Sequence, residues 1–141
     1  MTGGARRRPI GDWLVLAGGV FITLSSAAHA FLGWPGLAAE LEPFNPSDSV
    51  RQTVAIGWTF GSAAMLAMGL VTLLAFAELP RAGAALASRV ALVIGLAYLA
   101  FGIGAFAYSS GNPHFFGFMA IGLLLSLGAV LGRRRPRASG E

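Results

Sequence analysis

Apolar residues form four long runs along this chain, at about residues 10–33, 53–77, 84–108 and 113–132. Each run reaches the ~20 residues that a helix needs to cross the ~30 Å hydrocarbon core of a membrane. Backbone groups exposed to lipid must form their hydrogen bonds within their own segment, so these runs predict helices. The alternating segments of about ten residues that build a membrane β-barrel are not visible. We therefore expect an all-α membrane protein with residues 1–141 as one domain, in which four transmembrane helices form a compact bundle.

The longest polar interval separates the first two runs and is predicted to be an outer loop over residues 34–52. It contains three prolines, which favour turns and interrupt helices. Its apolar residues alternate with Glu40 and Glu42. This pattern fits either a plain connector or a short helix that lies at the membrane interface above a pocket.

Small residues share one face of each predicted helix. In membranes, such residues let helix backbones approach closely, so these faces predict helix–helix contacts. At 100° per residue, the four faces consist of Gly11, Gly18, Ser25, Ser26, His29 and Gly33; of Thr53, Gly57, Gly61, Ala64 and Ala75; of Ala84, Ser88, Ala91, Gly95 and Gly102; and of His114, Gly117 and Gly128. Gly57 and Gly61 also form a GxxxG pattern, which could contact a second copy or a partner membrane protein.

The distribution of arginine predicts how the chain is oriented. All ten basic residues are arginines, and only Arg51 falls on the outer side of a four-span arrangement. Cytoplasmic segments of membrane proteins carry the excess of basic residues, so both termini are expected in the cytoplasm. The Ala-, Gly- and Arg-rich composition without lysine is typical of a GC-rich bacterial genome, and it places the protein in the bacterial inner membrane.

The first apolar run can also be interpreted as a signal peptide. Arg6–Arg8 precede it, and Ala28-His29-Ala30 resembles an A-x-A cleavage site. However, apolar residues continue to Trp34, whereas the core of a signal peptide spans ~7–15 residues. We expect this run to be retained as a transmembrane helix.

Several classes of chemistry are excluded by residues that the chain lacks. There is no lysine for a Schiff base, and there is no cysteine for disulfide exchange, thiolate catalysis or iron–sulfur ligation. The predicted spans also lack the mid-membrane carboxylate that proton-coupled transporters commonly use. The net charge of +4 comes from arginines beside the apolar runs, so the expected partner is the lipid bilayer and not nucleic acid.

The two histidines of the chain, His29 and His114, are the candidate site residues. At ~1.5 Å per residue, His29 lies about 28 Å along the first helix, near the outer interface, and His114 opens the fourth helix on the same side. Both fall on small-residue faces, so we expect them to point into the bundle. Trp34, Trp58 and Tyr108 belong to the same outer half and complete the candidate site.

Three interpretations of the histidine pair stay open. Each imidazole can be a buried polar group that bonds to Ser25, Ser26 or Asn112 without a cofactor. The pair can ligate haem b or a metal ion, although two ligands do not complete a zinc site. It can also form the polar part of a pocket for a lipid, a quinone or another small apolar molecule.

The leading hypothesis is a small integral membrane protein with a structural, accessory or interaction role. It would act through its glycine-rich helix faces on a second copy or on a partner membrane protein. The alternative is an outer-half four-helix bundle that binds a small molecule, a lipid, haem or a metal ion through His29 and His114. No catalytic residue and no cofactor are predicted, and an enzyme is not the expectation.

Overall fold

The computed structural model describes residues 8–79 and 84–133, and within these ranges the secondary structure is entirely helical. The long helices are α1 (Ile10–Ala28), α3 (Asp48–Ala77), α5 (Ala84–Tyr108) and α6 (Phe116–Arg133). The short elements are the π-helix η1 (His29–Gly33), α2 (Trp34–Leu41), the 3₁₀-helix η2 (Glu42–Phe44) and the 3₁₀-helix η3 (Pro113–Phe115). The prediction of an all-helical chain with four long apolar helices is confirmed.

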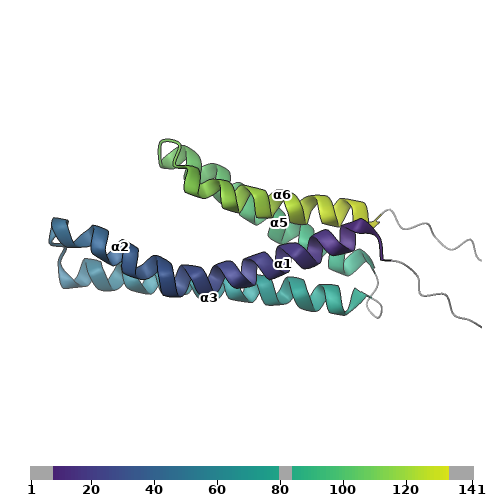
Figure 1. Cartoon of the computed structure of the whole chain (residues 1–141), viewed down its shortest axis with the longest axis horizontal. Helices are drawn as coiled ribbons and strands as arrows, with labels where there is room; N and C mark the ends of the chain where they lie inside the picture. Colours follow the sequence, from purple (N-terminus) through teal and green to yellow (C-terminus); the bar gives the residue numbers. More distant parts are fainter. Residues whose placement is uncertain (1–7, 80–83, 134–141) are drawn as a thin grey trace, which may run out of the picture.

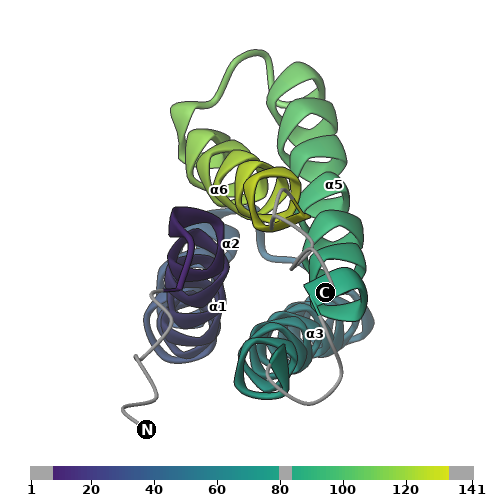
Figure 2. The same ribbon diagram turned by 90° about the vertical axis from the view of Figure 1, so that its right-hand side faces the viewer.

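The four long helices pack as a ring in which each contacts two neighbours (Figures 1 and 2). α1 packs against α3 and α6, and α5 packs against α6 and, less extensively, against α3. All four contribute to one apolar core, which consists of Ile22, Met65, Ile94, Tyr98 and Leu125. The predicted bundle is therefore closed by contacts between the first and the last helix.

The surface of the bundle is suited to lipid. Each long helix contains an 18-residue window apolar enough to cross a membrane, and at most 28% of any such window is buried inside the bundle. Large apolar side chains such as Phe21, Ile56 and Val93 are more than half exposed. An apolar surface of this extent needs acyl chains to cover it, so the chain is a small integral membrane protein.

Close helix contacts occur at some of the predicted glycines. A Cβ atom added at Gly11 would lie 2.6 Å from the carbonyl oxygen of Gly128, so α1 and α6 touch backbone to backbone. A Cβ atom at Gly95 would lie 2.9 Å from the carbonyl oxygen of Gly122, and α5 and α6 therefore meet in the same way. These contacts fit the expected use of small residues in membrane helix packing.

The contact face predicted for the second span is wrong at its GxxxG pattern. A Cβ atom added at Gly57 would meet nothing within 4 Å, and one at Gly61 would meet only the His29 ring. The close contact of α3 lies at Gly69 instead, against Thr23 of α1. α1 crosses α3 in the C-terminal half of α3. The periodicity of small residues alone does not reveal where along the helix this crossing lies. On α6, Gly128 packs as predicted, whereas Gly117 also lies in open space.

Most of the predicted outer loop over residues 34–52 is helical, so the plain connector is wrong, and a short helix, the other alternative, is present at Trp34–Leu41. The first helical segment continues from Ile10 through η1, α2 and η2 to Phe44, and α3 already begins at Asp48. The irregular connection between them covers only residues 45–47, and Ser47 Oγ accepts a hydrogen bond from the Val50 backbone N–H at 3.4 Å. Pro35 lies at the start of α2, directly after the π-helix η1, and the helical segment continues through it.

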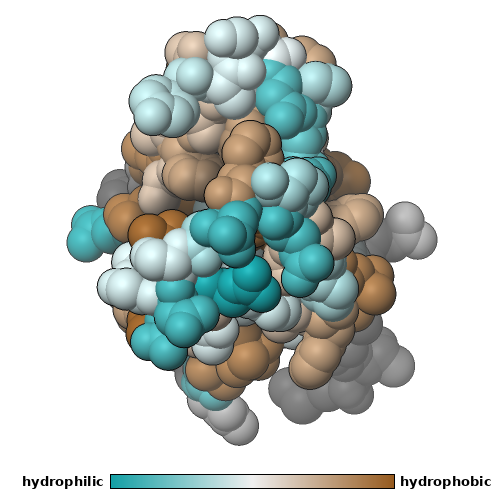
Figure 3. Space-filling model, turned by 90° about the vertical axis from the view of Figure 1, so that its left-hand side faces the viewer, coloured by the Kyte–Doolittle hydropathy of each residue, from teal (hydrophilic) through white to brown (hydrophobic). Residues whose placement is uncertain are grey.

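The bundle opens toward the end that carries α2, the start of α3 and residues 109–112, which we call the distal end. There the α1–α2 and α3 hairpin diverges from the α5 and α6 hairpin (Figure 1). At about 1.5 Å per residue, the 35 residues from Ile10 to Phe44 extend roughly 50 Å, well beyond a ~30 Å core. Figure 3 looks onto this end, where hydrophilic surface gathers, and Arg51 pairs there with Glu42 at 3.7 Å.

Candidate functional site

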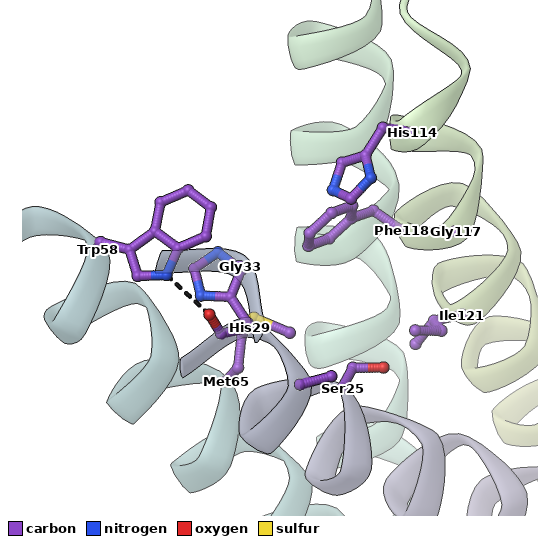
Figure 4. A pocket seen from close by; sticks show the side chains of 10 residues that line it. Ser25, His29, Gly33, Trp58, Met65, His114, Gly117, Phe118 and Ile121 are labelled. Atoms are coloured by element: carbon purple, nitrogen blue, oxygen red, sulfur yellow. Dashed lines mark hydrogen bonds between the residues drawn. The ribbon is translucent and has the colours of Figure 1, made fainter. Parts of the chain in front are cut away.

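A cleft lies where the two hairpins diverge, and His29 stands in it together with residues of the opposite hairpin (Figure 4). It has two branches, which share His29, Met65 and Phe118 as wall residues. The α1–α6 branch has a volume of about 300 Å³, and the α3–α5 branch has a volume of about 430 Å³. We call both together the histidine cleft. Volumes of this size are typical of small-molecule sites.

The imidazole of His29 is held by α3. Its Nδ1 lies 2.8 Å from Ser62 Oγ, and the same hydroxyl donates to the Trp58 carbonyl oxygen at 3.0 Å. A hydroxyl has a single proton, so the two bonds form together when Nδ1–H donates to Ser62. This tautomer leaves the lone pair of Nε2 available to a ligand.

Trp58 of α3 also holds His29, through both the ring and the backbone of His29. Its indole ring stacks on the His29 ring with centroids 4.0 Å apart and planes 7° from parallel. Its Nε1–H donates to the His29 carbonyl oxygen at 2.8 Å. A Cβ atom at Gly33 would lie 2.5 Å from the indole, so this glycine makes room for the ring. Side chain and backbone of His29 are therefore both positioned by α3.

The π-helix η1 explains how the His29 carbonyl reaches Trp58. Proline has no N–H and its ring clashes with the carbonyl of the residue four positions earlier, which for Pro35 is Phe31. Widening the preceding turn from α to π relieves that clash. The turn that Pro35 widens begins at His29, and π-turns of this kind occur frequently at functional sites.

His114 approaches the cleft from the opposite hairpin. Its backbone N–H donates to Asn112 Oδ1 at 2.9 Å, which caps η3. Its ring lies edge-on to Phe115 and Phe118, is solvent-exposed, and lines the α1–α6 branch. Both histidines thus line one cleft, but His114 is exposed, whereas the sequence predicts that it points into the bundle. The expected imidazole partners are wrong, because Ser62 bonds to His29 and Asn112 holds only the backbone of His114.

The aromatic residues of the predicted site separate into two groups. Trp58 lines the cleft, whereas Trp34 and Tyr108 line neither branch. Tyr108 is 94% exposed at the end of α5. Trp34 is partly buried in the first turn of α2. Both positions suit an aromatic belt at a membrane interface.

Two wall residues have roles that sequence analysis missed. Ser62 has no distinguishing signal, because its role depends on which helix lies beside α1. Tyr98 is a polar-tipped residue in the middle of an apolar span, and that position is a usable signal. It is 3% exposed, lines the α3–α5 branch, and its hydroxyl has no hydrogen-bond partner in the described part of the chain.

The donor set limits which groups the cleft can hold. Among residues 8–79 and 84–133, no three histidine, aspartate or glutamate side chains converge on one point. A closed tetrahedral zinc site, which needs four such ligands, therefore does not fit. The two imidazoles and the Met65 thioether are the side chains in the α1–α6 branch that could ligate haem or a soft metal ion.

No known protein family, no curated protein and no solved structure matches this chain.

Proposed function

We propose that this protein binds a small, mostly apolar molecule from the bilayer in the histidine cleft, with His29 as its polar contact. The observation that carries the proposal is the fixed imidazole. Ser62 and Trp58 hold His29 in one orientation and leave Nε2 unpaired among the described residues, in a cleft whose walls are mostly apolar. Specific ligand sites combine mostly apolar walls with a few fixed polar groups in this way.

The proposal also states in which membrane the protein lies and how the chain is oriented across it. The arginine distribution favours the bacterial inner membrane with both termini in the cytoplasm. The distal end and the histidine cleft then lie in the outer half of the bilayer, where a ligand could enter sideways between the hairpins. Most of the arginines behind this expectation, Arg81 among them, lie outside the described residues.

The test uses 11-(dansylamino)undecan-1-ol, an apolar fluorescent probe whose terminal hydroxyl can donate a hydrogen bond to Nε2 of His29. Trp58 serves as the energy donor in a W13F/W34F background, which leaves it as the single tryptophan. We expect saturable energy transfer from Trp58 to the dansyl group in protein purified in detergent. His29→Ala should lower the affinity at least fivefold, since it removes the polar contact of the ligand.

A matched pair of variants separates binding in the cleft from partition onto the apolar surface. Gly117 and Gly104 both lie in open space on exposed helix faces, but only Gly117 lines the cleft. Gly117→Leu should block the probe, and Gly104→Leu should not. Equal binding by both variants would contradict the proposal, and a Soret band in the purified parent would assign the cleft to haem.

The open GxxxG pattern supports a second candidate, an accessory role through contact with a second copy or a partner membrane protein. Gly57 and Gly61 make no close helix contact within the bundle. Because the chain has no cysteine, Gly57→Cys introduces a single thiol. A disulfide-linked dimer in oxidised membranes would support this role if Gly104→Cys remains monomeric, and a monomeric Gly57→Cys would count against self-association.

A further inference from the structure

Tyr98 and His29 line the same branch of the histidine cleft. They come from α5 and from the junction of α1 with η1, and both border the α3–α5 branch. The other wall residues of this branch are carbon-rich or thioether side chains. The walls of this branch therefore contain two polar side chains in apolar surroundings.

The Tyr98 hydroxyl lacks a partner. It is buried together with the rest of the side chain, and the described residues offer it no hydrogen bond. Buried hydroxyls in native proteins are paired in the large majority of cases, so this group needs an acceptor from outside the chain. An oxygen atom of a bound ligand would supply one once the side chains that cover the hydroxyl in this structure move apart.

The His29 imidazole complements this donor. With Nδ1–H donated to Ser62, Nε2 can only accept a hydrogen bond. A ligand that pairs with both groups therefore presents a hydrogen-bond donor such as a hydroxyl to His29 and an oxygen lone pair to Tyr98. One phenolic hydroxyl at each end of a ring satisfies both groups at once.

The walls of the branch favour a flat ring between these groups. Tyr98 stacks on Phe118 with centroids 5.8 Å apart, and Phe101 lies edge-on to Phe118 at 4.9 Å. Aromatic walls attract planar rings beyond the effect of buried area alone. The volume of about 430 Å³ holds a substituted single ring and leaves its apolar tail to the bilayer.

We propose that the histidine cleft binds the reduced, dihydroxy form of a membrane quinone, with one hydroxyl donating to His29 and the other oxygen accepting from Tyr98. The inference rests on the proposed function and narrows it to a ligand class. It concerns binding only, and it predicts preference for the quinol because a quinone carbonyl has no proton to donate to His29.

The experiment measures displacement of the dansyl probe by decylubiquinol and by decylubiquinone under anaerobic conditions. We expect the parent to bind the quinol at least fivefold more tightly than the quinone. Tyr98→Phe removes only the unpaired hydroxyl, so the fold should keep its thermal stability while quinol affinity falls about fivefold, as expected for one hydrogen bond. Tyr108→Phe, at an exposed tyrosine outside the cleft, should change nothing.

The possible outcomes are distinguishable. Equal affinity for the two redox forms, or an unchanged quinol affinity in Tyr98→Phe, would overturn the quinol assignment while probe binding keeps the cleft as a binding site. A dansyl probe that does not bind the parent, or that binds Gly117→Leu and Gly104→Leu equally, would remove the proposed function and the quinol assignment together.

Discussion

At the scale of single residues, His29 shows how a histidine in an apolar helix is satisfied without a charged partner. The hydroxyl of Ser62 forms a hydrogen bond with the imidazole. The indole of Trp58 stacks on the His29 ring and donates to the His29 carbonyl oxygen. Buried polar groups are costly unless they are paired, and here the partners of the imidazole and of the carbonyl oxygen both come from α3. An imidazole that is fixed in this way exposes one ring nitrogen to the cleft with little freedom to turn.

Ser62→Ala should weaken ligand binding although Ser62 itself does not need to touch the ligand. The substitution removes the acceptor of His29 Nδ1–H, and one neutral hydrogen bond is worth ~1 kcal/mol, or about fivefold in affinity. Titration with the dansyl probe measures the effect. Thr59→Ala is the control, because Thr59 also bonds to the carbonyl four residues earlier but does not reach His29. If the two variants bind alike, the orienting role of Ser62 is wrong.

The contacts of single residues also show what sequence analysis cannot predict. That both histidines lie toward the same end of the bundle could be predicted because helix rise and span direction follow from the hydropathy pattern. The partners of His29 could not, because they depend on the contact of α1 with α3, and helix adjacency has no signature in a single sequence. Ser25 and Ser26 were plausible partners from their place on the same helix face, but Ser26 Oγ donates to the Thr23 carbonyl oxygen instead.

At the scale of helices, the π-turn at η1 links Pro35 to the geometry of the histidine cleft. Pro35 was interpreted as the end of the first helix, since prolines in soluble helices usually have that effect. In this chain the helix accommodates Pro35 by widening one turn, which aims the His29 carbonyl at Trp58. The error in the helix boundary and the position of His29 in the cleft thus involve the same local feature.

Pro35→Ala should therefore weaken the site while it strengthens the helix. Alanine restores the missing N–H and removes the ring, so a regular α-helical turn becomes the favoured geometry from His29 onward. We expect probe affinity to fall, and the emission of Trp58 to shift because its indole N–H loses the His29 carbonyl. Pro43→Ala, in η2 and outside the cleft, is the matched control. Unchanged emission and affinity would show that Pro35 does not shape the site.

Helix contacts give a second prediction at this scale. Gly95→Leu forces a side chain against the Gly122 carbonyl, and overpacking of this kind typically costs ~1–3 kcal/mol. Gly57→Leu places the same side chain in open space and should leave stability unchanged. Thermal unfolding in detergent measures both variants. A loss of stability in Gly57→Leu would show that the GxxxG face is packed, as its small-residue pattern suggested.

At the scale of the whole molecule, the four spans were predictable because length and hydropathy determine what can cross a bilayer. The asymmetric opening of the bundle was not predictable. It arises because α1, η1, α2 and η2 form one helical segment longer than α5 or α6, so that the two hairpins part toward the distal end. The histidine cleft is a consequence of this opening, and its residues come from both hairpins.

The orientation of the molecule decides which leaflet the cleft faces, and it can be tested with single cysteines in this cysteine-free chain. We expect Ser110→Cys, at the distal end, to react with a membrane-impermeant maleimide in intact spheroplasts. Ser139→Cys, near the C-terminus, should react only after the membrane is permeabilised, because the arginines that precede it favour the cytoplasm. Reaction of both residues in intact cells, or the reverse pattern, would overturn the orientation. The reverse pattern would move the cleft to the inner leaflet, and the proposed ligand would then have to enter from that side.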